Sequence, residues 1–241
     1  MGKLTLDKSA PRIRSMFDRI APAYDFLNHF LSAGIDIWWR RMAVRGLPKK
    51  NGIFVLDVAT GTGDFAFSLF KYQPGAIIIG VDLAPAMLKK ATLKYKNKSK
   101  GMQRYHAVQG DALKLPIKPH SLDVVMIAYG IRNVPDVDEA LQEFQRVLKP
   151  GGHVLILEFS LPAKGPGRQL YLLYFNHILP ILGGLISGDK NAYKYLTESV
   201  HDFIGPEDMG HALVEAGFSI IKSHLLIGGI TYYILAQKRE V

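Results

Sequence analysis

The sequence predicts an α/β fold in which a mostly parallel, doubly wound sheet ends in an antiparallel hairpin. Apolar runs near 53–58, 76–81, 104–109, 122–128 and 153–159 alternate with helical patterns near 63–71, 85–96, 136–148 and 167–187. Alternation of strand and helix predicts parallel strands. After a further helical pattern at 207–216, two strand-like runs, 218–226 and 231–237, are joined by Gly228 and Gly229. We therefore expect one seven-stranded sheet.

A helical segment precedes the first strand and is extra to this minimal layout. Its apolar residues recur at three- and four-residue steps, as one buried helix face requires: Ile13, Met16, Phe17, Ile20 and Tyr24. The 241 residues contain no linker and no internal repeat, so a single domain is expected. We expect residues 11–48 to form a helical cap and residues 162–204 an apolar lid.

A glycine-rich turn follows the first apolar run and predicts a cofactor site. Gly61 and Gly63 lack a Cβ, so the backbone can turn sharply and approach a ligand closely. With Ala66 they satisfy the G-x-G-x-x-A pattern of dinucleotide-binding turns, and a nicotinamide cofactor is one interpretation. The carboxylates of Asp57 and Asp64 favour S-adenosylmethionine instead, because they would repel a pyrophosphate and attract a sulfonium and an amino group.

Two further acidic residues follow the next strands. Asp82 ends the second apolar run, about 20 residues after the glycines, at the distance that suits a ribose diol. Asp111 follows the third run and suits a hydrogen bond from an adenine amino group. Because ligands bind at the carboxyl ends of parallel strands, we expect Asp57, Asp82 and Asp111 to lie together. The alternative is that each only caps a helix or stabilises a turn.

The composition excludes several kinds of chemistry. The chain has no cysteine, so it has no disulfide, no thiolate nucleophile and no zinc–thiolate site, and we expect no metal. The polar N-terminus lacks the apolar core of a signal peptide. These features fit a cytoplasmic protein.

The net charge of +9 favours attraction to an anionic surface, either lipid or nucleic acid. Arginines gather at Arg40, Arg41 and Arg45, and the lysines cluster at Lys89, Lys90, Lys94, Lys96, Lys98 and Lys100.

Residues 170–187 are very apolar, yet Asn176, His177, Pro180 and a glycine pair interrupt them. The stretch barely reaches the roughly 20 residues that a membrane span requires. We therefore expect no transmembrane helix. The segment is interpreted either as a buried lid helix or as an apolar wall for a lipophilic substrate, in peripheral contact with the bilayer.

Five more segments carry a resemblance to a known family: residues 16–25 (MFDRIAPAYD) with Asn28, 34–40 (GIDIWWR), 130–134 (GIRNV), 157–160 (LEFS) and 193–199 (YKYLTES). From about residue 12 to 238 the chain resembles the quinone-biosynthesis C-methyltransferases. The resemblance implies a Rossmann-like class I methyltransferase fold, S-adenosylmethionine as cofactor and demethylmenaquinol, a lipophilic isoprenoid quinol, as substrate. A ubiquinol precursor is the alternative substrate.

The resemblance also implies cofactor contacts at Thr62, Asp82, Asp111 and Ala112. Some relatives have asparagine in place of Asp111, and some have serine in place of Ala128, so a hydroxyl contact is lost at that position. Together with the turn and strand-end patterns, the predicted cofactor-binding residues are Asp57, Gly61, Thr62, Gly63, Asp82, Leu83, Asp111, Ala112 and Ala128.

The implied reaction transfers a methyl group to a ring carbon of the reduced quinone. A phenol has a pKa of about 10, so a base or a cation must favour its ionisation at neutral pH. We expect Arg132 to stabilise the phenolate; the alternative is a structural ion pair with Asp123 or Asp136. The candidate proton acceptors are His29, His177 and His201, with Tyr24 and Asp25 as orienting residues.

Three rival functions remain from the residues alone. The charge allows a nucleic-acid methyltransferase, but residues 128–133 lack the paired prolines of amino-methylating enzymes, and we expect no nucleic-acid partner. The glycine pattern allows a nicotinamide oxidoreductase, and a binding module without catalysis is the third. The oligomeric state stays open, with a homodimer as one candidate.

Overall fold

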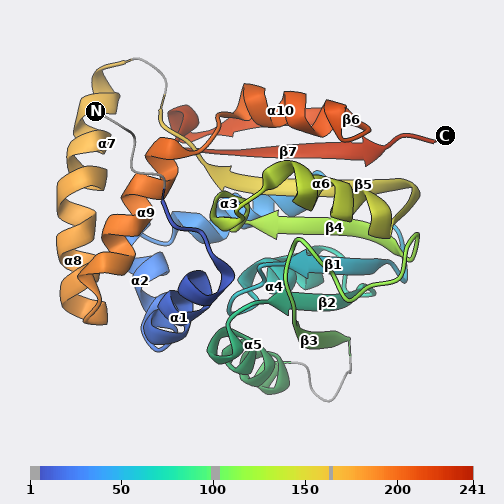
Figure 1. Cartoon of the computed structure of the whole chain (residues 1–241), viewed down its shortest axis with the longest axis horizontal. Helices are drawn as coiled ribbons and strands as arrows, with labels where there is room; N and C mark the ends of the chain where they lie inside the picture. The colour runs from blue at the N-terminus through green and yellow to red at the C-terminus, as the bar shows by residue number, and fades with distance from the viewer. Residues whose placement is uncertain (1–5, 99–103, 163–164, 241) are drawn as a thin grey trace.

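The computed structural model describes residues 6–98, 104–162 and 165–240, so Lys100 of the lysine cluster lies outside the described residues. Its centre is a seven-stranded sheet in the order β3-β2-β1-β4-β5-β7-β6 (Figure 1). The strands are β1 (Phe54–Val58), β2 (Ile77–Asp82), β3 (Tyr105–Gln109), β4 (Leu122–Ala128), β5 (Leu148–Phe159), β6 (Phe218–Leu226) and β7 (Thr231–Lys238).

The strand directions confirm the predicted sheet. β1 to β5 are parallel, with Val55 opposite both Ile78 of β2 and Val124 of β4. β7 is antiparallel to both neighbours and enters between β5 and β6, placing Tyr233 opposite Leu157. The C-terminal hairpin thus forms one edge of the sheet, where a two-half dinucleotide-binding fold would have a sixth parallel strand.

Helices cover both faces of the sheet. One face packs against α3 (Ile35–Val44), α4 (Asp64–Tyr72) and α5 (Pro85–Lys98), and the other against α6 (Val137–Val147) and α10 (Pro206–Glu215). The inward face of α6 is apolar at three- and four-residue steps, which is why the helix packs there: Ala140, Leu141, Phe144 and Val147 are all fully buried.

A second group of helices gathers at the carboxyl ends of the parallel strands (Figure 1). It contains α1 (Ala10–Ile20), α2 (Tyr24–Leu31), α7 (Pro166–Leu173), α8 (Leu179–Ser187) and α9 (Lys190–Asp202). Their shared core includes Leu27, Phe175 and Tyr193, from segments far apart in the sequence. The segment before β1 and the segment between β5 and β6 therefore cover the same end of the sheet.

Residues 167–187 form the predicted helix, but the expected interruptions do not break it. A π-helical turn (Tyr174–Ile178) joins α7 to α8. Its i→i+5 hydrogen bonds do not continue past Leu179, because the next residue, Pro180, has no N–H. Gly183 allows α8 to approach α9, since a Cβ there would lie 2.3 Å from Tyr193. The polar residues Asn176 and His177 thus lie in the π-helical turn, and Gly183 lies where two helices pack closely, so neither feature ends the helix.

By length and composition alone, the run Gly167–Ser187 is long and apolar enough to cross a membrane, with mean hydropathy 1.5. The expectation that this segment does not span a membrane therefore cannot rest on its length. Its side chains nevertheless tie it to the domain, because Phe175 and Leu179 belong to the core shared with α2 and α9.

Candidate active site

Two adjoining cavities lie at the carboxyl ends of the parallel strands. The strand-end cavity is lined by the ends of β1 to β4, and the aromatic cavity by side chains of the covering helices and of β5. They share Phe17, Tyr24, Tyr129 and Asn133 as a common wall. A ligand in one cavity is therefore separated from a ligand in the other by a single layer of side chains.

Six of the nine predicted cofactor-binding residues line the strand-end cavity: Gly61, Asp82, Leu83, Asp111, Ala112 and Ala128. Asp82 holds the glycine turn against β2, because its carboxylate accepts hydrogen bonds from the backbone N–H of Gly61 (2.8 Å) and of Ala84 (2.9 Å). Burial raises the pKa of Asp82 to about 6. Asp111 accepts a hydrogen bond from the N–H of Leu113, which orients its side chain beside the cavity.

Asp57 lies beneath the turn and outside the residues that line either cavity. Its side chain is 1% exposed and accepts a hydrogen bond of 2.6 Å from the Thr60 hydroxyl, which lies 3.2 Å from the Tyr105 hydroxyl. Burial raises the pKa of Asp57 to about 7. Its position suits support of the turn rather than direct contact with a ligand.

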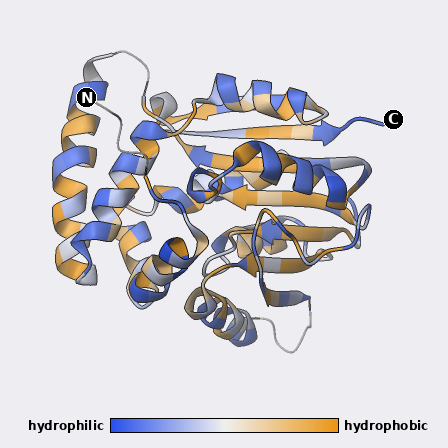
Figure 2. Ribbon diagram, in the orientation of Figure 1, coloured by the Kyte–Doolittle hydropathy of each residue, from blue (hydrophilic) through white to orange (hydrophobic). Residues whose placement is uncertain are grey.

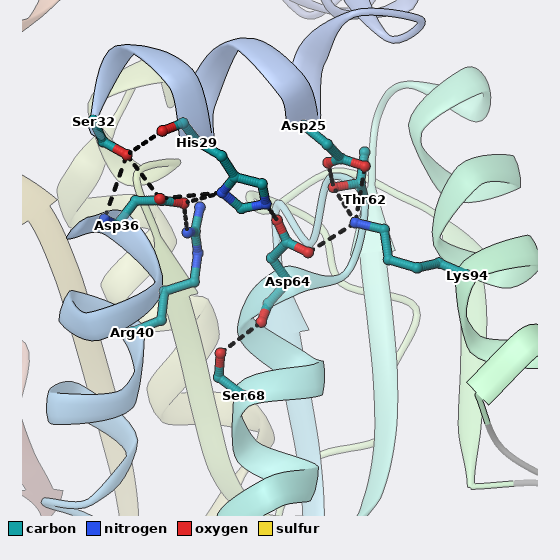
Figure 3. Close-up of polar contacts among 9 residues, drawn as sticks. All are labelled: Asp25, His29, Ser32, Asp36, Arg40, Thr62, Asp64, Ser68 and Lys94. Carbon is teal, nitrogen blue, oxygen red and sulfur yellow. Dashed lines mark hydrogen bonds and ion pairs between the residues drawn. The ribbon is translucent and has the colours of Figure 1, made fainter. Parts of the chain in front are cut away.

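Thr62 and Gly63 are likewise not among the residues that line the strand-end cavity. The Thr62 hydroxyl donates to Asp25 of α2, and Lys94 of α5 bridges Asp25 (2.9 Å) and Asp64 (2.7 Å) (Figure 3). Gly63 has φ +86°, and a Cβ there would lie 2.8 Å from the Phe67 ring. These contacts fix the turn to α2 and α5, and the Thr62 hydroxyl already donates its hydrogen bond to Asp25.

The same polar network continues through α2 and α3 (Figure 3). His29 lies between two carboxylates, with Nδ1 2.9 Å from Asp36 and Nε2 3.8 Å from Asp64. Asp36 also accepts from Ser32 (2.7 Å) and from Arg40. Although burial opposes ionisation, the Arg40 guanidinium holds the pKa of Asp36 below its usual range. Asp25 and His29 thus bind the helices to the turn and line neither cavity.

The two other predicted histidines lie away from the cavities. His177 and His201 are both exposed, and His201 Nε2 lies 2.8 Å from the Asn176 side-chain oxygen. No histidine is found among the described residues that line the aromatic cavity. Their expected role as proton acceptors therefore has no support from their positions, whereas Tyr24 lines both cavities and has its pKa raised by burial.

The aromatic cavity has walls of rings and few polar groups. The rings of Tyr129 and Phe159 stack with centroids 4.3 Å apart, and Trp39 packs edge-on against both. The remaining lining is mostly aromatic or aliphatic, and its polar members are Asn28, Ser32, Asp36, Arg40, Arg132 and Asn133. Such a cavity suits a flat apolar ring that carries a few oxygen atoms.

Arg132 lines the aromatic cavity, and its partner differs from both expected ones. Its guanidinium donates to Glu158 at the end of β5 (2.6 Å) and to the Tyr129 carbonyl (2.5 Å). Asp123 instead pairs with lysines, and Asp136 caps α6. The ion pair is deeply buried, with Glu158 fully inaccessible to solvent.

The adjacency of β4 and β5 was the missed signal for this pair. Parallel neighbours end at the same edge, and Glu158 is the next-to-last residue of β5 while Arg132 follows β4. The 3₁₀ turn at Ile131–Asn133 then brings the guanidinium back over the strand ends. Arg40 and Asp36 were missed as a site because Arg40 was grouped with Arg41 and Arg45 in a cluster expected to attract an anionic surface, whereas Arg40 is buried.

A model described as the ubiE/COQ5 methyltransferase family matches residues 5–238. A relative from Thermus thermophilus, named demethylmenaquinone methyltransferase, is 46% identical over 88% of this chain and 96% of its own. A Syntrophotalea carbinolica relative, named ubiquinone/menaquinone biosynthesis C-methyltransferase, is 45% identical over 90% of each chain. A solved S-adenosylmethionine-dependent methyltransferase from Aquifex aeolicus shares the fold with TM-score 0.60 and 18% identity, covering 82% of this chain and 88% of that one.

The raised pKa of Asp57 predicts a pH-dependent stability. The folded state holds this proton more tightly than the unfolded chain, whose aspartates have a pKa near 3.8. The associated stability is present below about pH 4 and is lost as the pH rises through about 7. Asp57→Asn removes this loss. We therefore compare the melting temperature of the ligand-free variant minus that of ligand-free wild type at two pH values, and we expect this difference to be at least about 2 °C more positive at pH 8 than at pH 5.

Thermal unfolding at both pH values measures this difference. Glu215→Gln, on the exposed end of α10, is the matched control and should give the same difference at both. Equal differences for Asp57→Asn at pH 5 and pH 8 would contradict the prediction.

Proposed function

Because the chain belongs to the ubiE/COQ5 methyltransferase family, we propose that it transfers a methyl group from S-adenosylmethionine to a ring carbon of demethylmenaquinol. The observation that carries this proposal is the pair of cavities with a shared wall. One is built from acidic strand ends and the glycine turn, and the other from stacked aromatic side chains. They bring a polar cofactor and an apolar ring within one side-chain layer of each other.

The residues of the strand-end cavity fit S-adenosylmethionine, which supplies a methyl group activated by a sulfonium. Asp82 suits the ribose hydroxyls, and Asp111 suits the adenine amino group. Ala128, where a serine hydroxyl would add a contact, leaves the end of β4 without a side-chain donor. At the strand ends, the carboxylates of Asp82 and Asp111 favour a positively charged group over a pyrophosphate, while Lys8 and Arg14 also line the cavity.

We assign to Arg132 the stabilisation of the phenolate form of the substrate. A reduced ring becomes nucleophilic at the carbon next to an ionised oxygen, and a fixed guanidinium beside that oxygen favours ionisation. Glu158 and the Tyr129 carbonyl fix Arg132, so its orientation does not depend on the ligand. The Arg132 Nε is fully buried and has no hydrogen-bond partner among the described residues, so we expect the charge of the guanidinium, rather than a hydrogen bond from this atom, to stabilise the substrate oxygen.

The ring itself has two candidate identities. The relatives carry both menaquinone and ubiquinone names, and both substrates are reduced rings with two oxygens and an isoprenoid tail. The aromatic cavity favours the bicyclic ring of demethylmenaquinol, because stacking on the rings of Tyr129 and Phe159 increases with ring area. The ubiquinol precursor remains the second candidate.

Methyl transfer from labelled S-adenosylmethionine to demethylmenaquinone tests the proposed reaction. We expect label in the product only after chemical reduction of the quinone, because the oxidised ring is electrophilic. A reduced ubiquinol precursor is assayed in parallel. No transfer to either reduced substrate, in a protein that binds S-adenosylhomocysteine, would contradict the proposal.

Arg132→Gln is expected to lower kcat about 100- to 1,000-fold, because it removes a fixed donor from the developing phenolate. The affinity for S-adenosylhomocysteine, measured by calorimetry, should change less than about threefold, since Arg132 does not line the strand-end cavity. Adding Glu158→Gln avoids an unpaired buried carboxylate and should leave kcat equally low. Arg146→Gln, which breaks the Glu143 ion pair away from both cavities, is the control; a kcat loss no larger than that of this control would exclude Arg132 from the mechanism.

We also propose that the outer side of α7 and α8 rests on the membrane surface, where the substrate dissolves. Apolar residues run along both helices (Figure 2). Leu170, Leu173, Ile181 and Leu185 are each more than half exposed. Lys190 and Lys194 border Ile181 and Leu185 and suit anionic headgroups.

The inner side of the same helices supports this placement. Tyr171, Tyr174, Phe175 and Leu179 line the aromatic cavity, one helix width from the outer apolar residues. A quinol whose tail stays in the bilayer would reach the cavity past these helices, so the two functions share one structural element.

Replacing Ile181 and Leu185 by serine should weaken binding to vesicles of phosphatidylglycerol and phosphatidylcholine about tenfold or more, because two exposed apolar side chains lose their burial in lipid. Co-sedimentation measures binding. Activity on a short-tailed, water-soluble quinol should stay unchanged, since neither residue lines the strand-end cavity or the aromatic cavity. Ile221→Ser, at an exposed position of β6, is the control, and equal binding by all three proteins would refute the docking proposal.

A further inference from the structure

A second arginine–carboxylate pair lines the aromatic cavity, and the proposed methyl transfer does not use it. Arg40 of α3 donates to Asp36 one turn earlier, and the two residues are 7% and 3% exposed. Both line the cavity that also contains Arg132. The cations that line this cavity are therefore two buried arginines, each neutralised by its own carboxylate.

The two guanidiniums belong to one aromatic wall. Arg40 lies 5.5 Å from the centroid of Tyr129, and Arg132 lies 5.4 Å from the centroid of Phe159. These two rings are the stacked pair. Tyr24 lines the same cavity, and burial raises the pKa of its hydroxyl while the charges of Arg40 and Arg132 oppose that rise.

Arg40 has donors to spare. A guanidinium carries five N–H groups, and Asp36 is its one hydrogen-bond partner among the described residues. A buried cation of this kind is costly unless its remaining donors find acceptors. The α3 side of the cavity therefore offers donors to an oxygen-bearing ligand.

We propose that Arg40, held by Asp36, binds the second oxygen of the ring, the one not adjacent to the carbon that accepts the methyl group. This inference rests on the proposed function and assigns Arg132 and Arg40 to opposite oxygens of a 1,4-hydroquinone. The adjacent oxygen supplies electrons to the reacting carbon, whereas the distant oxygen lies meta to it and contributes mainly to orientation. Arg40 is thus a specificity-determining residue that selects a hydroquinone over a monophenol.

The polar network supports a positioning role. Asp36 is fixed from three sides, by Arg40, Ser32 and His29, and His29 leads on to Asp64 beside the glycine turn (Figure 3). The Arg40 side of the aromatic cavity is therefore connected by polar contacts to the glycine-rich turn, which shapes the strand-end cavity. A ring held at both oxygens would be presented to the shared wall in one orientation.

A substrate–enzyme double-mutant cycle tests the proposal. Wild type and Arg40→Gln are each assayed with a short-tailed 1,4-naphthohydroquinone and with the naphthol that keeps only the hydroxyl adjacent to the reacting carbon. We expect Arg40→Gln to lower kcat/KM about 10- to 100-fold for the hydroquinone, mainly through KM, and less than about threefold for the naphthol. The cycle cancels the difference in intrinsic reactivity between the two substrates.

Controls separate this role from a loss of folding. Arg41→Gln, at the exposed neighbouring position of α3, should behave as wild type. Asp36→Asn combined with Arg40→Gln avoids an unpaired carboxylate and should give the same substrate pattern as Arg40→Gln alone. Thermal unfolding and S-adenosylhomocysteine affinity report whether each variant is intact.

The outcomes are distinct. Equal losses of kcat/KM for hydroquinone and naphthol in the double variant would overturn the role of Arg40 and leave the proposed reaction standing. Failure of intact wild type to methylate either substrate would overturn the proposed function and the role of Arg40 with it.

Discussion

The attachment of α2 to the glycine-rich turn is the interaction on which the site depends. Asp25 accepts from Thr62 and pairs with Lys94, while His29 bridges Asp36 and Asp64. Because these residues lie on the polar side of α2, the remaining side of the helix is presented to the cavities, where Tyr24 and Asn28 line the walls. One set of charged contacts therefore positions the helical cover, the turn and the cavity wall together.

Charge burial explains how a site without a histidine in its described lining can favour a phenolate. A neutral base would have to accept the proton directly, whereas a fixed guanidinium lowers the cost of ionisation by its field. That field is strong in an apolar cavity, where water does not screen it. Glu158 and Asp36 keep the two cations stable while the site is empty, and their hydrogen bonds leave other N–H groups free.

The helices α7 and α8 show why apolar composition alone was ambiguous. The same run contributes Phe175 and Leu179 to the core, Tyr171 and Tyr174 to the cavity, and Leu170 and Leu185 to the exposed side. A lid and a membrane-docking surface are therefore not alternatives for this segment. Helical periodicity distributes its apolar residues over three environments, and the π-helical turn resets the faces between α7 and α8.

The sequence by itself determined the order of the elements, the antiparallel closing hairpin and the acidic strand ends around the glycine turn. These features rest on local patterns and on the rule that parallel strands end at one edge. Only the tertiary structure decided which polar groups meet. Arg132 pairs with Glu158 rather than with Asp123 or Asp136, and Thr62 faces Asp25 rather than the strand-end cavity. Such pairings join segments far apart in the chain, so no local pattern encodes them; they follow from how the covering helices pack on the sheet.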